Sequence, residues 1–305
     1  METKTKGYVS ACDLLPQKFA RVLKLLPPNI QAKTEEIRLR AGGMLAVVFG
    51  GKTYFLTNAA ELTLTPQQNS VLVAAADLFE VARLICNNSV YSHQDEILNG
   101  YVTMPFGNRA GVCGVFRQGK FCDITSVNIR ISHQIIGAAK NLIQNYGGGS
   151  VLICGPPGSG KTTFLRDFVR SLSNGETGKS YRVSVIDTRG EIAAVAGGVP
   201  QNDVGFNTDV ISGRPKPEGI EVALRSMSPE VIAFDEIGTE KELSGVMQSV
   251  NTGVFIVTTA HIGSEAELKK RGVTKNLIKS GVINKIVFLK KVGELPLILE
   301  GEICG

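Results

Sequence analysis

The segment VLICGPPGSGKTT (151–163) decides the fold of this chain. Gly155, Gly160, Lys161 and Thr162 complete the pattern G-x-x-x-x-G-K-[ST] of a Walker A phosphate loop. The apolar run before the loop suits a buried parallel strand, and the segment TTFLRDFVRSL after it has apolar residues at helical spacing. The alternative is a glycine-rich turn that happens to contain Lys-Thr. The strand and helix on either side favour the phosphate loop.

The residue types of this loop match the chemistry of a polyphosphate. Glycines let the backbone turn sharply and bring its N–H groups close to the phosphates, and the start of the next helix adds partial positive charge. Lys161 can reach the β and γ phosphates, and the Thr162 hydroxyl can ligate Mg²⁺. We therefore expect ATP and Mg²⁺ to bind through Gly155, Pro156, Pro157, Gly158, Ser159, Gly160, Lys161, Thr162 and Thr163.

The composition indicates an ordinary soluble protein. The chain has 305 residues, of which 43% are hydrophobic and 20% are charged, and its net charge of +5 permits contact with acidic lipid or nucleic acid without arguing for either. Six cysteines without a CxxC pair indicate reduced cytosolic thiols. The N-terminus has no apolar core of signal-peptide length. The longest apolar region (71–85) carries charges at helical spacing and predicts an amphipathic helix instead of a membrane span.

The first part of the chain, residues 1–131, predicts a smaller mixed α/β domain. We expect helices at 16–27 and 67–87, and strands at 35–40, 45–50, 53–56, 101–104, 110–117 and 120–125. Residues 132–149 predict a connecting helix (133–146) followed by the run Gly147-Gly148-Gly149, which would be a flexible joint.

The second part, residues 150–305, alternates strands and helices. Nearly continuous apolar runs are typical of strands buried on both faces of a parallel sheet. They predict strands at 151–154, 182–187, 231–235, 254–258 and 284–289. The expected fold class is therefore α/β, with a RecA-like, doubly wound, mostly parallel sheet as a P-loop ATPase core.

Two acids end the expected strand VIAFDE (231–236). The carboxyl end of a strand in such a sheet lies close to the phosphate loop, where ligands bind. We assign Asp235, as in a Walker B motif, to Mg²⁺ through a water molecule. We assign Glu236 to polarising the attacking water. The alternative is a strand that ends in two solvated acids.

Three further segments offer candidate site residues. The strand IVTTAH (256–261) ends in His261, which is either a γ-phosphate sensor or a surface histidine. The strand VIDTRGE (185–191) would place Asp187, Arg189 and Glu191 at the ligand edge, and Glu191 is the second candidate for the catalytic base. The segment 209–230 carries Arg214, Lys216 and Arg225, any of which could equally belong to a basic surface loop.

Several longer segments together resemble the stage III sporulation protein AA family of ATPases. The resemblance rests on EEIRLRAG (35–42), ICNNSVYSHQDEILNGYVTM (85–104), SVNIRI (126–131), PPGSGKTTFLRDFVRSLS (156–173), VPQNDVG (199–205), RPKPEG (214–219) and RSMSPEVIAFDEIGT (225–239). It covers nearly the whole chain, and RSMSPEVIAFDEIG is its most specific part because generic ATPases lack it.

This resemblance implies an AAA-type motor for the channel between mother cell and forespore. The family is itself similar to type II and type IV secretion and pilus ATPases, which usually act as hexamers at the cytoplasmic face of a membrane channel. It implies a homo-oligomeric ring, peripheral to the mother-cell membrane through a membrane-bound channel protein. TTAH then looks like the histidine box of these ATPases, and residues 187–191 look like their aspartate box.

The chain departs from the family pattern at three places. Thr188 and Gly190 interrupt the expected Asp-Glu-Arg-Ser-Glu, and Asn207 replaces an expected arginine. Phe106-Gly107-Asn108-Arg109 also lacks the usual Gly-Gly. Ring ATPases often place one subunit's arginine at its neighbour's γ-phosphate, where it stabilises the transition state. Without an arginine at 207 the candidates are Arg189, Arg214 and Arg225, and we expect Arg225 to act.

Three functions are compatible with these motifs. The first is hydrolysis that drives a sporulation secretion or feeding channel. The second is a nucleic-acid-binding ATPase, although the chain has no tryptophan and no dense basic stripe interleaved with aromatic residues. The third is a nucleotide-dependent assembly scaffold with weak turnover, which the departures from the family pattern keep open.

Overall fold

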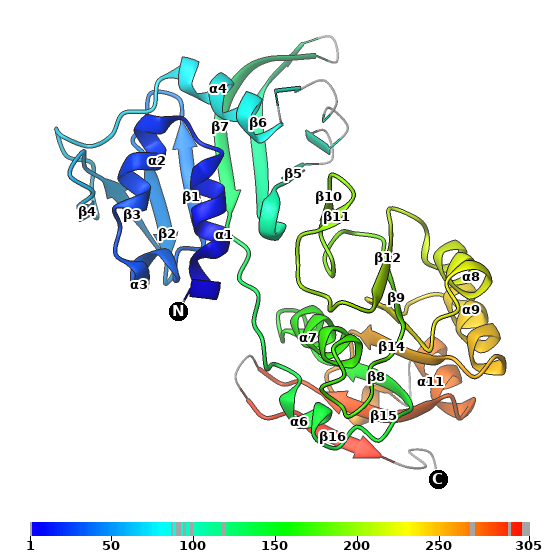
Figure 1. The fold of residues 1–305 in the computed structure, drawn as a ribbon. Helices are drawn as coiled ribbons and strands as arrows, with labels where there is room; N and C mark the ends of the chain where they lie inside the picture. Colours follow the sequence, from blue (N-terminus) through cyan, green and yellow to red (C-terminus); the bar gives the residue numbers. More distant parts are fainter. Residues whose placement is uncertain are drawn as a thin grey trace. The chain divides into compact units, whose positions relative to one another are not determined.

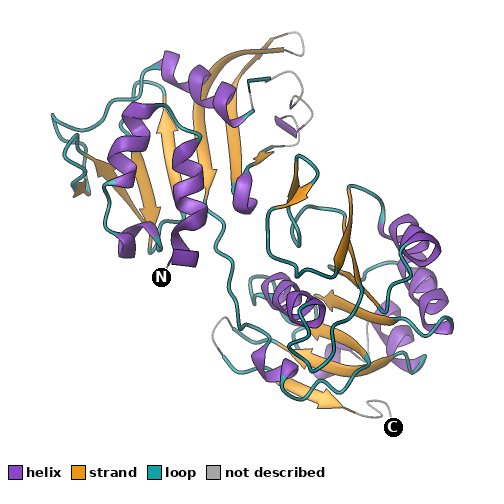
Figure 2. Cartoon of the chain, in the orientation of Figure 1, coloured by secondary structure: helices purple, strands orange, loops and turns teal. Residues whose placement is uncertain are grey.

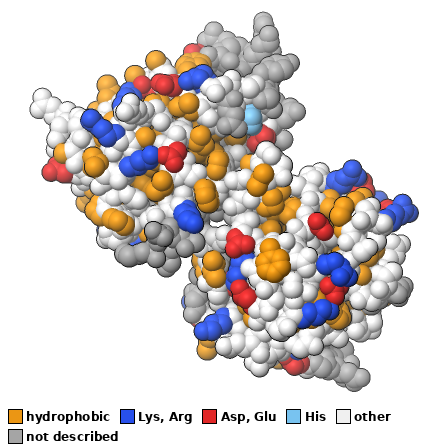
Figure 3. Space-filling view, viewed as in Figure 1, with side chains coloured by type: hydrophobic (Ala, Val, Ile, Leu, Met, Phe, Trp, Pro, Cys, Tyr) orange, Lys and Arg blue, Asp and Glu red, His pale blue; other side chains and the backbone are white. Residues whose placement is uncertain are grey.

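The computed structural model describes residues 2–86, 88–89, 93, 96–97, 100–117, 120–268, 272–291 and 294–300 (Figures 1 and 2). The chain separates into two compact units, Met1–Gln134 and Ile135–Gly305. Among the described residues, every helix is too short or too polar to cross a lipid bilayer. On the face drawn in Figure 3, basic and acidic side chains are interspersed over the described surface.

The first unit is an antiparallel sheet with helices packed against it (Figure 1). In its described part, seven strands follow the order β4-β3-β2-β1-β7-β6-β5. They are β1 (Glu36–Arg40), β2 (Ala46–Phe49), β3 (Lys52–Leu56), β4 (Leu62–Thr63), β5 (Val102–Thr103), β6 (Arg109–Arg117) and β7 (Lys120–Arg130). The helices are α1 (Glu2–Asp13), α2 (Gln17–Lys24), α3 (Pro28–Gln31), α4 (Ala75–Ile85) and the 3-10 helix η2 (Pro105–Gly107).

One core joins these elements. Tyr8 and Phe19 of the first two helices are fully buried, as are Ile37 and Ile129 of the two central strands. The helix expected at 67–87 begins only at Ala75, so the first part of that prediction is wrong. Residue 71 instead joins the sheet, since the Val71 N–H donates to Leu56 O at 2.9 Å.

The second unit is the expected P-loop ATPase fold of class α/β. Its described strands form a seven-stranded sheet in the order β12-β9-β13-β14-β8-β15-β16, parallel except for the last pair. They are β8 (Ser150–Cys154), β9 (Val183–Asp187), β12 (Thr208–Ser212), β13 (Val231–Phe234), β14 (Phe255–Ala260), β15 (Ile283–Phe288) and β16 (Leu297–Glu300), beside the small hairpin β10 (Val195–Ala196) and β11 (Val199–Pro200).

Helices of this unit cover both faces of the sheet. They are α6 (Lys140–Ile143), α7 (Lys161–Ser173), α8 (Lys216–Ser226), α9 (Glu240–Asn251), α10 (Glu265–Leu268) and α11 (Gly272–Lys279). Phe164, Leu165, Phe168 and Leu172 of α7 are buried in one core, as their helical spacing predicts, while the buried residues of α8 and α9 belong to a second core. A core on each face is what makes the central strands apolar throughout.

The segment before the phosphate loop differs from its prediction. Only Lys140–Ile143 of the expected helix 133–146 is helical, because Gly137 has φ +89° and interrupts the helical backbone. The glycine run lies inside the second unit, so it is not the joint between the two units. The Tyr146 hydroxyl donates to Gly149 O at 2.5 Å, and a Cβ on Gly149 would lie 2.7 Å from Asn284 Oδ1. The chain divides earlier, between Gln134 and Ile135.

A buried charge cluster fixes the far end of α7. Arg170 donates to Asp167 Oδ1 from Nη2 at 3.1 Å and to Glu176 Oε1 from Nη1 at 2.5 Å. The Asp167 side chain is only 1% exposed, and its other oxygen accepts the Ala139 N–H at 2.9 Å. The cluster therefore ties α7 to the start of α6.

We expect Arg170→Met to lower the free energy of unfolding by about 3 kcal/mol, because it leaves the buried Asp167 carboxylate without its cation. Denaturant titration at pH 7 measures this. Lys179→Met, which removes an exposed partner of Glu230, should change stability far less. The hydrogen bond from Arg170 lowers the pKa of Glu176 below its ordinary 4.5. The difference in the free energy of unfolding between the parent and Arg170→Met should therefore narrow as the pH falls below 4.5. Equal stability of the two proteins would contradict the account.

Candidate functional site

The phosphate loop connects β8 to α7. Gly158 and Gly160 have φ +75° and +89°, a left-handed conformation that glycine adopts without steric cost. A Cβ on Gly155 would lie 2.4 Å from Ser159 Oγ and 2.6 Å from Leu289 O, so this position admits no side chain. The backbone thus has the tight turn that brings N–H groups to the start of α7, where the helix dipole also favours an anion.

Lys161 lies inside this loop. Its Nζ donates to Gly155 O and to Pro156 O, both at 2.9 Å, and lies 3.0 Å from His261 Nδ1. Burial lowers the pKa of Lys161 below its ordinary value, although the nearby Asp235 and Glu236 carboxylates oppose that shift. The ammonium group is therefore a partly desolvated cation held by neutral acceptors, which suits a polyphosphate.

Asp235 lies beside the phosphate loop, directly after β13. Its Oδ2 accepts the Thr162 hydroxyl at 2.7 Å, and its Oδ1 accepts the Thr259 hydroxyl. The order of the sheet explains this contact, because β14 lies between β8 and β13 and carries Thr259 at its carboxyl end. A carboxylate and a hydroxyl that meet at this distance offer the oxygen ligands that Mg²⁺ prefers, so the residues fit the metal.

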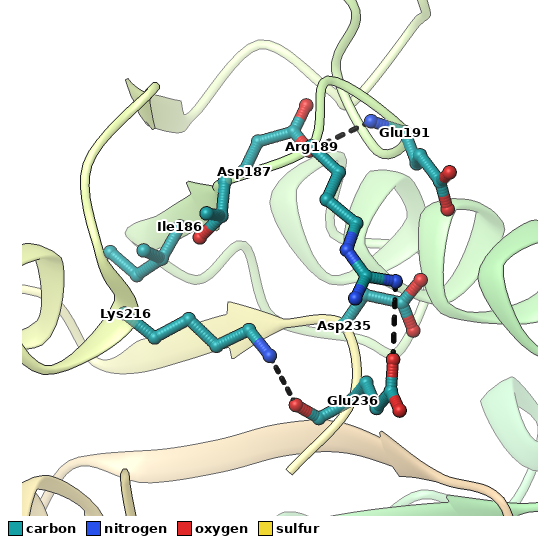
Figure 4. Close-up of a pocket in the computed structure, with 8 residues that line it drawn as sticks. Ile186, Asp187, Arg189, Glu191, Lys216, Asp235 and Glu236 are labelled. Atoms are coloured by element: carbon teal, nitrogen blue, oxygen red, sulfur yellow. Dashed lines mark hydrogen bonds and ion pairs between the residues drawn. The ribbon is translucent and has the colours of Figure 1, made fainter. Parts of the chain in front are cut away.

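Glu236 follows with a left-handed backbone, at φ +57°. Its N–H donates to Thr259 Oγ1 at 2.8 Å. Its carboxylate lies 3.3 Å from Arg189 Nη1 (Figure 4). It also lies 3.8 Å from His261 Nε2. The structure thus brings together Lys161, Asp235, Glu236 and His261, which come from three separate motifs.

Asp187 supports the loop after β9. Its two oxygens accept four successive backbone N–H groups, those of residues 191–194, at 2.8 to 3.2 Å, and the residue is 2% exposed. Arg166 of α7 donates to the carbonyl oxygens of Glu191 and Ile192 from the other side. Asp187 therefore shapes the loop that carries Arg189 and Glu191.

The phosphate loop opens onto a pocket of about 380 Å³. Its walls hold most of the predicted residues, namely Gly158, Gly160, Lys161, Thr162, Thr163, Arg189, Glu191, Asp235, Glu236 and His261. A second pocket of about 430 Å³ shares Gly160 and Thr163 with the first. Its lining is largely apolar and includes Ile135, Ile136, Phe164, Leu289 and Pro296. A polar pocket and an apolar pocket that meet at a phosphate loop match the two halves of a nucleotide.

The candidate arginines occupy different places. Arg189 faces Glu236, whereas Arg225 lies in the last turn of α8, is 76% exposed, and pairs with Glu221 at 2.7 Å. Arg214 is exposed, and its carbonyl accepts the Thr188 hydroxyl at 3.0 Å. Asn207 precedes β12, at the sheet edge opposite the phosphate loop.

Sequence reasoning missed three supporting residues. The sequence shows Thr259 only as a member of the histidine motif. In the structure its hydroxyl donates to Asp235 and accepts the Glu236 N–H. Arg166 looked like one more polar residue of α7. Lys216 was grouped with the basic loop, but its Nζ donates to the Glu236 carbonyl (Figure 4). A polar residue inside an apolar strand run was the available signal for Thr259, and no comparable signal marks the other two.

Comparisons with known proteins agree on one family and one fold. A family model described as "Sporulation stage III, protein AA" matches residues 10–301. Stage III sporulation protein AA of Bacillus subtilis (strain 168) is 31% identical over 288 residues, which is 92% of this chain and 90% of that protein. Protein SEEDLING PLASTID DEVELOPMENT 1 of Arabidopsis thaliana is 35% identical over 143 residues, 45% of this chain and 20% of that protein.

Two solved structures share the fold. The ATPase DotB of Legionella pneumophila has a TM-score of 0.54 at 18% identity, and the match covers 93% of this chain and 81% of that chain. The pilus retraction motor PilT, whose structure holds ADP, has a TM-score of 0.58 at 18% identity, with 87% and 77% covered.

Proposed function

The chain belongs to the stage III sporulation protein AA family, and we propose that it is a Mg²⁺-dependent ATPase and the motor subunit of a sporulation secretion or feeding channel. The observation that carries the proposal is the convergence of Lys161, Asp235 and Glu236 on one pocket beside a glycine-rich loop. Release of phosphate from ATP that requires Mg²⁺ tests it.

Each group in this pocket has a role in phosphoryl transfer to water. Backbone N–H groups of the loop and the Lys161 ammonium bind the β and γ phosphates. Thr162 and Asp235 would hold Mg²⁺, which would neutralise charge on the phosphate oxygens. Glu236 accepts a hydrogen bond from the attacking water and polarises it. His261 contacts both Lys161 and Glu236, so it is placed to respond to the γ-phosphate.

The nucleoside half of ATP would occupy the apolar pocket. The two pockets share Gly160 and Thr163, so a phosphate chain on the loop places the base and ribose toward Ile135, Ile136 and Leu289. An apolar lining gives a flat base favourable burial. ATP is therefore the proposed nucleotide, with its phosphates in the polar pocket and its base in the apolar one.

The motor role draws on family membership. A ring of identical subunits at the cytoplasmic face of the mother-cell membrane, attached through a membrane-bound channel protein, is the proposed assembly. A nucleic-acid-binding ATPase is the weaker alternative, because the drawn surface interleaves both signs of charge. Filter binding with single-stranded and duplex nucleic acid separates the two functions.

An assembly scaffold with weak turnover is supported by one observation. The Glu236 carboxylate lies 3.3 Å from Arg189 Nη1, and a paired carboxylate polarises water less effectively than a free one. Phosphate release well below that of a motor, together with tight ATP binding, is the result that would favour the scaffold.

The variant Arg225→Ala tests a shared site, in which one subunit's arginine completes the ATP site of its neighbour. Arg225 is exposed on α8, and its ion pair with the exposed Glu221 can open toward a neighbouring subunit's γ-phosphate, where an arginine is worth about 10³-fold in rate. We expect the variant to keep its ATP affinity and to lose at least about tenfold in turnover. Parent turnover per subunit should also rise with protein concentration.

The matched control is Glu221→Gln, which removes the partner of Arg225 within the chain and leaves the arginine in place. It should hydrolyse ATP at nearly the parent rate. Turnover per subunit that is brisk and constant down to the monomer would refute the shared site.

A further inference from the structure

The turn that carries Glu236 has a backbone that needs external support. Glu236 has φ +57°, which is sterically disfavoured for a residue with a Cβ. Such a conformation persists only where the surrounding structure holds it, and it is common at functional sites. The support on one side is Thr259, which accepts the Glu236 N–H.

Lys216 supplies the support on the other side. Its Nζ donates to the Glu236 carbonyl oxygen (Figure 4). The same Nζ lies 3.3 Å from Glu242 Oε1. The Lys216 and Glu242 side chains are 17% and 12% exposed, so solvent competes weakly for these contacts. Both peptide groups that flank the Glu236 Cα are thereby fixed, one through its N–H and the other through its C=O.

The position of Lys216 is not explained by helix stability. It is the first residue of α8, where the helix dipole disfavours a cation. The lysine instead contacts the Glu236 carbonyl oxygen and the Glu242 carboxylate of α9, and these contacts give it a role at the Glu236 turn.

Glu242 extends the support along the turn. Its Oε2 accepts the N–H groups of Gly238 and Thr239 at 2.8 and 3.0 Å. Burial opposes ionisation, but these hydrogen bonds and the Lys216 charge outweigh it and lower the pKa of Glu242 below its ordinary value. Glu242 is therefore ionised at neutral pH, and it holds Lys216 and the turn at once.

We infer that Lys216 and Glu242 are positioning residues that hold the backbone of the catalytic Glu236, and that Lys216 does not bind the nucleotide. The inference rests on the proposed function for the catalytic role of Glu236. The clamp, meaning the contacts of Lys216 and Glu242 with the turn at residues 236–239, rests on the observed contacts alone. Lys216 acts through the Glu236 peptide group and touches no reacting atom.

Two measurements on the full chain test the inference, with Lys216→Met, Lys216→Arg and the exposed control Lys241→Met. The first is hydrogen exchange of the amides of residues 236–239 without nucleotide. Loss of a hydrogen bond from a charged donor is worth 1.5–3 kcal/mol, so Lys216→Met should speed this exchange about tenfold or more. Lys216→Arg should restore much of the protection, since it keeps a charged donor, and Lys241→Met should match the parent.

The second measurement is steady-state ATP hydrolysis. Lys216→Met should lower kcat about tenfold or more and leave KM within about twofold, because a misplaced base slows chemistry without weakening binding. A raised KM with unchanged kcat would overturn the inference and make Lys216 a nucleotide ligand. Unchanged exchange would overturn it too, whatever the kinetics. If the parent hydrolyses no ATP while exchange responds to Lys216→Met, the clamp stands and the proposed function fails.

Discussion

Glu236→Gln should bind ATP about as tightly as the parent and hydrolyse it at least about 10²-fold more slowly. The amide keeps the size of the side chain, so the turn at residues 236–239 and the phosphate loop stay in place. It loses the basicity that orients and polarises water, and it loses the charge that faces Arg189 and His261. Nucleotide titration and phosphate release on the same preparation measure the two effects separately.

The control for this variant is Glu240→Gln, which changes an exposed carboxylate at the start of α9. It should leave both binding and turnover near the parent values. Parent-like turnover in Glu236→Gln would move the catalytic role elsewhere. Glu191 is then the next candidate, because it lines the same pocket.

Lys161→Ala should weaken ATP binding by about 10² or more, since it removes charge-assisted hydrogen bonds worth roughly 1.5–3 kcal/mol each to the phosphates. The present acceptors of Lys161 are two backbone carbonyls of its own loop and a histidine nitrogen. A phosphate would offer this ammonium a stronger, charged acceptor. Calorimetric titration with Mg²⁺ and ATP gives the affinity directly.

Lys279→Ala serves as the matched control, because Lys279 is exposed in the last turn of α11 and has the same side chain. A thermal melt of each variant separates lost binding from lost folding. If folded Lys161→Ala binds ATP as well as the parent, the phosphate-loop assignment is wrong.

The second unit was predictable because its signals are local. The apolar strands and the helical spacing of α7 follow directly from burial on both faces of a parallel sheet. The family resemblance and the fold class are confirmed by the comparisons. The conformation of the phosphate loop was also predictable, since Gly158 and Gly160 stand where the backbone has positive φ.

The errors arose where distant contacts override local pattern. Residues 67–74 looked helical, yet Val71 finds its hydrogen-bond partner in the neighbouring sheet. The glycine run at 147–149 predicts a joint before the second unit, yet it lies inside that unit, where a Cβ on Gly149 would meet Asn284. Asp187 lies at the predicted edge of the sheet, and what the sequence does not show is that its carboxylate accepts four backbone N–H groups.

The supporting residues of the site were hidden for the same reason. Lys216 is 20 residues from Glu236 and Thr259 is 23, and only the order of the strands and helices brings these side chains to one turn. A charge at the wrong end of a helix is a weak local hint. Only the folded chain shows that the acceptor of Lys216 is the Glu236 carbonyl oxygen.

Phosphate release from ATP by the purified chain, measured with and without Mg²⁺ beside Lys161→Ala, tests whether the chain hydrolyses ATP through its phosphate loop. Release should require Mg²⁺, saturate with ATP and be abolished in the variant. Phosphate release that persists unchanged in Lys161→Ala would contradict the proposed function. A parent protein that binds ATP but releases no phosphate at any protein concentration would contradict it too.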